Sequence, residues 1–411
     1  MTDAVRSYVT DIPIPPSPGT ATLFRLSARK MKQSLSLPAA ILITACGASA
    51  PRSETPRPRE VVEMEEMRIT ASRGDDGDLE LASYDAEMLF TRATALLNSQ
   101  RCSEAVAFYD RLANEFPTSR YLSPALYNAG LCLQDTGQHE PAADRYERLL
   151  RETPGSPDVK HARLQLAGVL VHLERWERAM HVTDDVLALE DLSADERVEA
   201  MARRAQALLG LERVDEAQTQ ARSAIAYWRA RDEADAVRNN FHVAAANFVL
   251  ADTIRRQGEA IAIPQAEVQT QHEVLEQKAQ LLLQAQREYF NVMQHRNAHW
   301  AAAAGYRIGA MYDHLWGEIM TAPTPPPRNP LPGGTEGVYE HEYRLELARL
   351  VKPLLRHSIR YWELTLMMVE RTGVRTDWAE RVREDLERAR TRLLEQPEGQ
   401  GGLPASQTTA P

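Results

Sequence analysis

Cysteine is scarce in this sequence: 411 residues contain only three, too few for a fold framed by disulfide bonds. The sequence also contains no phosphate-cradling glycine loop and no Gly-x-Ser-x-Gly turn that would present a nucleophilic serine. The formal net charge of −10 argues against a nucleic-acid-binding protein and against docking on anionic lipid through a basic surface. Alanine, leucine, arginine and glutamate are abundant instead, and these residues favour helices.

The nearest approach to a metal site is the pair His295 and His299, spaced so that both could lie on one helix face. The segment lacks the glutamate of the metalloprotease motif, and Asn297 indicates a helix boundary between the two histidines. The many carboxylates lie among arginines, as in residues 380–385, where salt bridges along a solvated helix are expected. We therefore predict no metal, no cofactor, no small-molecule substrate and no catalytic residue.

The first 46 residues have the pattern of an export signal. Four basic residues between positions 25 and 32 precede the apolar stretch 35–44, which is too short to span a bilayer because a spanning helix needs about 20 apolar residues. A positive segment, a short apolar core and small residues are typical of a secretory signal peptide. We expect translation to start at Met31, since this start places the charges at the beginning of the signal.

The apolar stretch ends in Ile43-Thr44-Ala45-Cys46-Gly47, which resembles a lipobox, the lipidation signal of bacterial lipoproteins. The resemblance implies that Cys46 receives a diacylglycerol, becomes the mature N-terminus and holds the protein on the periplasmic side of the cell envelope. Gly47 stands where enteric lipoproteins of the inner membrane carry aspartate, which favours the outer membrane. The alternative is a chance cysteine after a cleaved signal or in a cytosolic tail.

Residues 47–80 are rich in Pro, Ser, Arg, Glu and Asp and contain few large apolar side chains. Such a segment cannot bury enough surface to offset its ordering entropy, so we predict a disordered tether with a reach of about 30 Å. The proline- and glycine-rich stretch 322–337 cannot be helical, and the polar tail 396–411 is expected to be disordered. Residues 325–327 are three prolines that form either a polyproline ligand or a stiff loop.

Four segments within residues 81–230 repeat one pattern of two predicted helices. In the second repeat Gly130 is the small residue of the first helix, Gly137 turns the chain and Pro154 ends the second helix. Small positions let the two helices of a hairpin approach closely, and large ones fill the space between hairpins. One alanine anchors the second helix of each repeat, at intervals of 37, 37 and 38 residues: Ala105, Ala142, Ala179 and Ala217.

This pattern resembles the tetratricopeptide repeat (TPR), and the match covers about residues 84–230. The resemblance implies an all-α solenoid of helical hairpins, with an unrelated helical bundle as the alternative. Because the period exceeds the 34 residues of an ordinary TPR, the subtype looks like that of bacterial envelope proteins such as the Bam-complex lipoprotein and the Tol-associated division coordinator. The Bam lipoprotein has five repeats and little else, and the longer C-terminal half here departs from that plan.

Residues 231–321 and 338–395 continue as longer predicted helices in which the period breaks. Residues 306–312 again look like a first TPR helix, with Gly309 at the small position, and the C-terminal half is similar to TPR lipoproteins of gliding-motility machinery. The leading hypothesis is a non-enzymatic scaffold that assembles a cell-envelope machine by binding other envelope proteins. The alternatives are an accessory role in outer-membrane protein assembly, an enzyme with an unrecognised site in residues 231–395, and a cytosolic TPR co-chaperone.

The inner surface of a TPR solenoid comes mainly from the first helix of each hairpin, at the second, fifth, ninth and thirteenth repeat positions. These positions hold no Lys or Arg of the kind with which co-chaperone TPRs pair a terminal carboxylate. An aromatic and aliphatic strip with polar flanks suits an extended or helical protein segment, unless the apolar members only pack within the solenoid. The predicted partner-binding residues are Phe90, Thr94, Tyr127, Leu131, Leu164, His172 and Gln206, with Glu87, Asn98, Asp135, His161 and Glu199 on the same surface.

Cys102 and Cys132 are predicted near the same edge of adjacent hairpins. An exported protein meets oxidising conditions, so a disulfide bond between them is one expectation. Two unpaired, partly buried thiols are the alternative.

Overall fold

The computed structural model describes residues 66–73, 79–231, 237–327 and 332–395. The predicted leader through Cys46, the tether as far as residue 65 and the tail 396–411 lie outside the described residues. Apart from one two-stranded sheet the described chain is all-α, which confirms the predicted fold class. The elements are β1 (Met67–Arg73), β2 (Leu79–Asp85), α2 (Ala86–Asn98), α3 (Cys102–Glu115), α4 (Leu122–Asp135), α5 (His139–Glu152), α6 (Val159–His172), α7 (Trp176–Leu187), α8 (Ala194–Gly210), α9 (Val214–Arg229), α10 (Asn240–Glu259), α11 (Val268–Gln294), α12 (Ala298–Thr321), α13 (Glu336–Thr372) and α14 (Asp377–Glu395).

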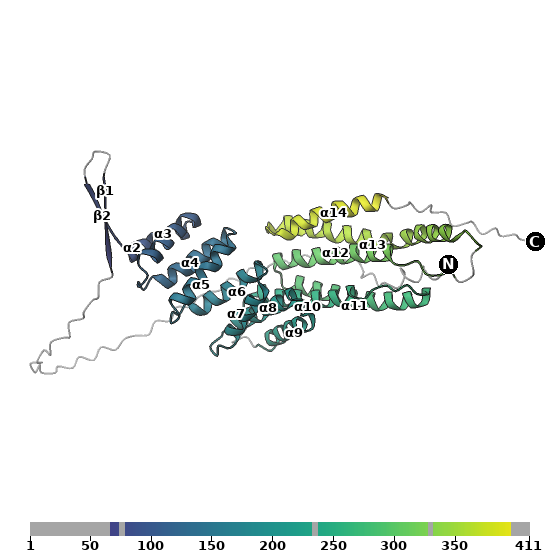
Figure 1. Ribbon diagram of the computed structural model, residues 1–411, viewed down its shortest axis with the longest axis horizontal. Helices are drawn as coiled ribbons and strands as arrows, with labels where there is room; N and C mark the ends of the chain where they lie inside the picture. The colour runs from purple at the N-terminus through teal and green to yellow at the C-terminus, as the bar shows by residue number, and fades with distance from the viewer. Residues whose placement is uncertain (1–65, 74–78, 232–236, 328–331, 396–411) are drawn as a thin grey trace, which may run out of the picture. The chain divides into compact units, whose positions relative to one another are not determined.

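The helices follow one another as hairpins, and each packs against its neighbours along the chain (Figure 1). The described residues form the hairpins α2–α3, α4–α5, α6–α7, α8–α9, α10–α11 and α12–α13, followed by α14. We call the two members of a hairpin its first and second helix. The terminal α14 covers the last hairpin, because its Val382, Leu386 and Ala389 pack with Trp362 of α13. None of the helices in these ranges combines the length and apolar character needed to cross a membrane.

The turn inside each of the first four hairpins contains one residue with a positive φ, two positions before the second helix. In the second hairpin this residue is Gly137, with a φ of 74°. The other three are Gln100, Glu174 and Glu212. A residue with a Cβ is strained in this left-handed region, so the packing of the two helices imposes the turn geometry against local preference.

Small residues of the first helices lie against aromatic rings of the second helices. A Cβ added at Gly130 of α4 would be 2.5 Å from the ring of Tyr146 in α5. At Gly309 of α12 it would be 2.4 Å from the indole nitrogen of Trp362 in α13. The four anchor alanines of the predicted repeats are fully buried. The close approach that the repeat pattern predicts is therefore present in the second hairpin and again in the sixth.

The fifth hairpin, α10–α11, has helices of 20 and 27 residues, whereas α4 and α5 have 14 each. Ala285 and Tyr289 of α11 are fully buried and lie four residues apart, as Ala142 and Tyr146 of α5 do. The helix α10 contacts α8, α9, α11 and α12, which explains why most of its residues are buried. Longer helices disrupt the fixed period, so the sequence pattern alone does not reveal this hairpin as a repeat.

A β-hairpin precedes the first helix, where the composition predicts a disordered tether as far as residue 80. Its strands pair antiparallel along their full length. Arg68 donates to the backbone carbonyl of Glu115 at 2.8 Å, and the Tyr84 hydroxyl donates to the Glu115 carboxylate at 2.6 Å. The prediction of disorder is wrong for β1 and the start of β2, because average composition does not register these tertiary contacts with the end of α3.

Candidate functional site

We call the surface formed by the first helices of the hairpins the inner face. Phe90 of α2 is half-buried on this face. Its ring stacks on that of Tyr121, with centroids 5.1 Å apart, and lies 5.9 Å from the ring of Tyr109. Part of the Phe90 ring therefore packs within the solenoid, and the rest is accessible to another molecule.

Two buried tyrosines of the second helices reach through to the inner face. The Tyr109 hydroxyl lies 3.2 Å from the Thr94 hydroxyl of α2 and accepts a hydrogen bond from the Asn128 amide of α4 at 3.3 Å. The Tyr146 hydroxyl donates to the side-chain amide oxygen of Gln134 in α4. The polar side chains of the inner face are thus held in place by bonds from beneath.

Tyr127 lies on the inner face of α4. It is half-buried, and its ring is 6.0 Å from that of Tyr146. Leu131, one helical turn further along α4, is also half-buried. These residues continue the partly accessible apolar surface that begins at Phe90. We call Phe90, Tyr121, Tyr127 and Leu131 the aromatic strip.

The inner face closes between α6 and α8, so the prediction that Leu164 contacts a partner is wrong. Leu164 is 3% exposed and packs with Val186 and Ala200. The two first helices approach each other because Gly168 of α6 has no side chain and Arg203 of α8 fills that space. A Cβ at Gly168 would lie 2.8 Å from the guanidinium carbon of Arg203. Leu164 is therefore a core residue.

Arg203 also lies on the inner face, but it does not occupy any of the four repeat positions from which the partner-binding residues were predicted. Its guanidinium donates to the backbone carbonyl of Leu164 and lies 2.7 Å from the Glu199 carboxylate. Glu199 in turn lies 3.5 Å from the imidazole of His242 in α10. Because Arg203 has these two partners and its side chain is 12% exposed, it is not arranged to pair a terminal carboxylate of a peptide. In the sequence, the close approach of α6 and α8 is indicated by Gly168, because glycine is unfavourable in the middle of a helix.

His172 and Gln206 lie at the margins of the inner face. His172 is exposed at the end of α6, and its ring centroid is 3.7 Å from that of His139 at the start of α5. Burial and the neighbouring His172 lower the pKa of His139. Gln206 is half-buried on α8, three residues after Arg203. The structure thus pairs His172 with a histidine that the predicted set does not contain.

Cys102 and Cys132 are free thiols that lie next to each other in the structure, and the disulfide bond between them stays a prediction. Cys132 is fully buried in the core between the first two hairpins, and Cys102 packs against that core. Burial and the adjacent Cys102 raise the pKa of Cys132 to about 12. A thiol with so high a pKa stays protonated and is a poor nucleophile.

His295 and His299 have separate partners, because a helix boundary divides them. His295 follows the last residue of α11, whereas His299 lies in the first turn of α12, which Asn297 caps. The His295 Nε2 atom is 3.1 Å from the Asn247 amide, and the His299 Nδ1 atom is 3.4 Å from the Thr376 hydroxyl. Across the described ranges no three His, Cys, Asp or Glu side chains are arranged to hold a metal ion.

The C-terminal hairpins contain a buried polar network centred on Asp252 of α10. Asp252 is 1% exposed and accepts a hydrogen bond from the Tyr289 hydroxyl at 2.5 Å. Its carboxylate also lies 3.1 Å from Arg255 and 3.3 Å from Arg307 of α12. Burial alone would raise the pKa of Asp252, but Arg307 and Arg255 outweigh burial and lower it to about 2. The opposite charges of this cluster offset one another, which indicates a role in joining α10, α11 and α12.

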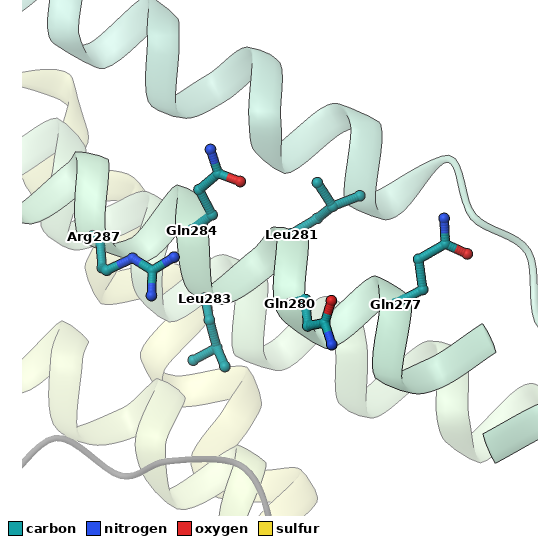
Figure 2. A pocket seen from close by; sticks show the side chains of 6 residues that line it. All are labelled: Gln277, Gln280, Leu281, Leu283, Gln284 and Arg287. Atoms are coloured by element: carbon teal, nitrogen blue, oxygen red, sulfur yellow. The ribbon is translucent and has the colours of Figure 1, made fainter. Parts of the chain in front are cut away.

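A surface hollow lies along α11 (Figure 2). Its lining comes from this one helix, and Leu281 and Leu283 point to opposite sides of it. The charged member of the lining is Arg287, and the polar members are glutamines. Amides and one arginine on a single helix do not converge on a point where a substrate atom could react.

Within these hairpins small residues of one helix pack against large residues of the other, and an aromatic strip on the first helices stays partly accessible. Both features are typical of helical-repeat proteins that bind other molecules. A sequence profile described as tetratricopeptide repeat matches residues 87–119 and 124–156, within the first two hairpins. The chain therefore contains tetratricopeptide repeats, and proteins of this fold typically bind other proteins and are typically non-catalytic.

Solved structures of TPR proteins show low similarity to this chain. A TPR protein from Parabacteroides merdae ATCC 43184 is 12% identical over 74% of this chain and 98% of that chain, with a TM-score of 0.38. MamA from Desulfovibrio magneticus RS-1, from residue 41 to its end, is 16% identical over 53% and 98%, with a TM-score of 0.34. YrrB, described as a TPR protein with an unusual peptide-binding site, is 22% identical over 49% and 92%, also with 0.34. These scores are too low to add to the profile match and the helix packing. A comparison with curated proteins gives no match.

Proposed function

We propose that this chain is a non-enzymatic scaffold that binds a segment of another protein on the inner face of its first two hairpins. The observation that carries the proposal is the aromatic strip, whose half-buried rings keep accessible apolar surface. Aromatic side chains contribute strongly to binding when a partner completes their burial. The hydroxyl of Thr94 and the amides of Asn128 and Gln134 lie in the same two hairpins and can bond a peptide backbone.

The double variant Phe90→Ala with Tyr127→Ala tests this proposal. Capture of the partner from crosslinked cells, followed by mass spectrometry, should fall at least tenfold, since two anchors of about 1 kcal/mol or more are lost. The matched control is Phe108→Ala, which removes a half-buried ring from the second helix α3. Circular dichroism melts should show all variants folded. If the double variant keeps full capture, the partner surface lies elsewhere and the proposal is wrong.

We further propose that a lipid on Cys46 holds the scaffold on the cell envelope, facing the periplasm and more specifically on the outer membrane. The support is the export signal and the lipobox-like sequence, which lie outside the described residues. In fractionation, Cys46→Ser should yield an unprocessed or soluble species in place of a membrane-bound, detergent-extracted one. A substituted protein that still fractionates with membranes as before contradicts the lipid anchor.

The machine that this scaffold serves is proposed from the resemblance of its C-terminal half to gliding-motility lipoproteins, with outer-membrane protein assembly as the alternative. A deletion strain distinguishes the two. Lost gliding with normal levels of outer-membrane proteins supports the first, and the reverse outcome supports the second. A catalytic site in residues 231–395 would need groups other than the Asp252 network, whose members already bind one another.

A further inference from the structure

We propose that the segment received by the aromatic strip is cationic, with a lysine or arginine beside an apolar anchor, and that the cation is placed near Tyr127. This inference rests on the proposed function, because it names the chemistry of the segment that the strip would bind. Such a segment is opposite in charge to the ligand of a co-chaperone TPR, whose basic residues bind a carboxylate.

Two carboxylates without a cationic partner lie toward the two ends of α4, one on either side of Tyr127. Asp135 is exposed at the last position of α4, the helix that carries Tyr127. Asp158 is half-buried immediately before α6 and accepts a hydrogen bond from the Ser123 hydroxyl at 2.9 Å. Among the described residues no lysine, arginine or histidine lies within ion-pair distance of either carboxylate. Their charges are therefore available to a ligand.

The nearby cation does not cancel these charges. Arg203 is paired with Glu199 at 2.7 Å, so the two together contribute little net charge. Burial and the negative charges of Glu199 and Asp158 raise the pKa of Tyr127, and Arg203 opposes them only in part. A cationic side chain beside this ring would be attracted by Asp158 and by the ring face. Asp135, eight residues further along α4 at roughly 12 Å, would attract it more weakly or act on a second basic residue of the segment.

Asp135 stands where helix formation disfavours an acid. The C-terminal end of a helix carries a partial negative charge, which favours a cation and disfavours a carboxylate there. Asp135 is the last residue of α4, so its charge weakens the helix that presents Tyr127. A bound cation would offset this local cost, whereas the fold of the hairpin does not require the acid.

The other end of the aromatic strip is balanced in charge. Arg120 lies 3.3 Å from Glu87 and 4.8 Å from the ring centroid of Tyr121, which stacks on Phe90. This end therefore favours the apolar anchor of the segment, and the Tyr127 end favours its basic residue. The geometry thus predicts an orientation for the bound segment as well as its charge.

Random dodecapeptides displayed on phage and selected on the full chain in 50 mM NaCl provide the probe. The enriched sequences should carry lysine or arginine beside an aromatic or aliphatic residue. A synthetic peptide of the leading sequence is then titrated by fluorescence anisotropy against the protein variants. Asp135→Asn and Asp158→Asn should each weaken binding about threefold to fivefold, and 500 mM NaCl should weaken it further. The matched control is Glu177→Gln with Asp185→Asn, two exposed acids of the second helix α7, which should bind as the unmodified chain does.

Two kinds of result overturn the proposal. Peptides that are acidic, that need a free terminal carboxylate, or that bind equally to the Asp135→Asn and Asp158→Asn variants would show that the site does not select a cation. If such peptides still lose binding in the Phe90→Ala with Tyr127→Ala variant, the proposed function stands and only the cationic partner is wrong. If no peptide is enriched, or if binding ignores the Phe90 and Tyr127 substitutions, both proposals fail.

Discussion

A residue in a left-handed turn shows how helix packing overrides local preference. A Cβ at Gly137 would meet no atom within 4 Å, so Gly137→Ala should cost about 1 kcal/mol through backbone strain alone. Glu174 occupies the equivalent turn of the next hairpin with a φ of 56°. Glu174→Gly relieves the same strain and should be neutral or stabilising by up to about 1 kcal/mol, because greater freedom of the unfolded chain offsets part of the gain. Urea unfolding of both variants tests this contrast, and equal destabilisation by the two would contradict it.

A buried histidine connects the packing of the first helices to pH. His242 is 8% exposed, and burial together with Arg203 lowers its pKa from 6.5 to about 3. The unfolded chain therefore takes up the proton first, so the stability that is present above pH 6.5 is lost as the pH falls toward 3. Between pH 6.5 and 5 this group should account for a loss of about 2 kcal/mol.

His242→Gln removes the titrating group and should flatten that part of the profile, measured as urea midpoints at pH 8, 6.5 and 5. A shallower acid slope should persist, because burial lowers the pKa of other histidines in the same direction. Those histidines are His139, His295, His299 and His357. An acid slope in the variant as steep as in the parent would show that burial of His242 is not its cause.

At the scale of helices, the first and second helices of the hairpins have different roles. Arg145 of α5 binds both carboxylate oxygens of Asp110 in α3, at 2.7 and 2.8 Å. Arg178 of α7 likewise pairs with Glu147 of α5. These bonds join the second helix of one hairpin to that of the next, and bidentate arginine pairs fix geometry well. Because the second helices hold neighbouring hairpins together in this way, the first helices are left to carry the aromatic strip.

The sequence predicts the helical hairpins because one small residue in each repeat is enough to reveal their period. The same register places Phe90 and Tyr127 on first helices, as the structure has them. It fails at Leu164, because repeat position says nothing about the distance between neighbouring first helices. That distance depends on Gly168 and Arg203, which belong to different hairpins and meet only after the chain has folded.

The β-hairpin and the helical hairpin α10–α11 are not predicted from the sequence for a related reason. The strands β1 and β2 depend on Arg68 and Tyr84 contacting Glu115, a residue that lies at the end of α3. The hairpin α10–α11 keeps the alanine-to-tyrosine step at Ala285 and Tyr289 but lengthens the helices around it. Local composition does not reveal the contacts of the β-hairpin, and a fixed period does not reveal a repeat with longer helices. The four-residue spacing of alanine and tyrosine does indicate the hairpin α10–α11.

At the scale of the whole molecule, the described helices form a row of hairpins in which most contacts join neighbours. Arrays of this kind have local rather than uniform stability, so a single free energy of unfolding does not describe them. Among the described helices, we expect α10 to be the most stable, since it contacts four other helices and is buried along most of its length. Its backbone amides should therefore exchange with solvent more slowly than those of α2 or α14.

Two matched cavity variants test this picture by hydrogen exchange and mass spectrometry. Leu126→Ala in α4 and Ile308→Ala in α12 each empty a position that is at most 1% exposed, at a local cost of about 2–4 kcal/mol. Leu126→Ala should speed exchange in the hairpins around α4 and leave α12 and α13 as they were, and Ile308→Ala should do the reverse. Faster exchange throughout the chain in both variants would show one cooperative unit instead. If the effects stay local, the partner proposed for the aromatic strip would order the first hairpins only. The C-terminal hairpins would then stay available to a second protein, as the proposed scaffold role requires.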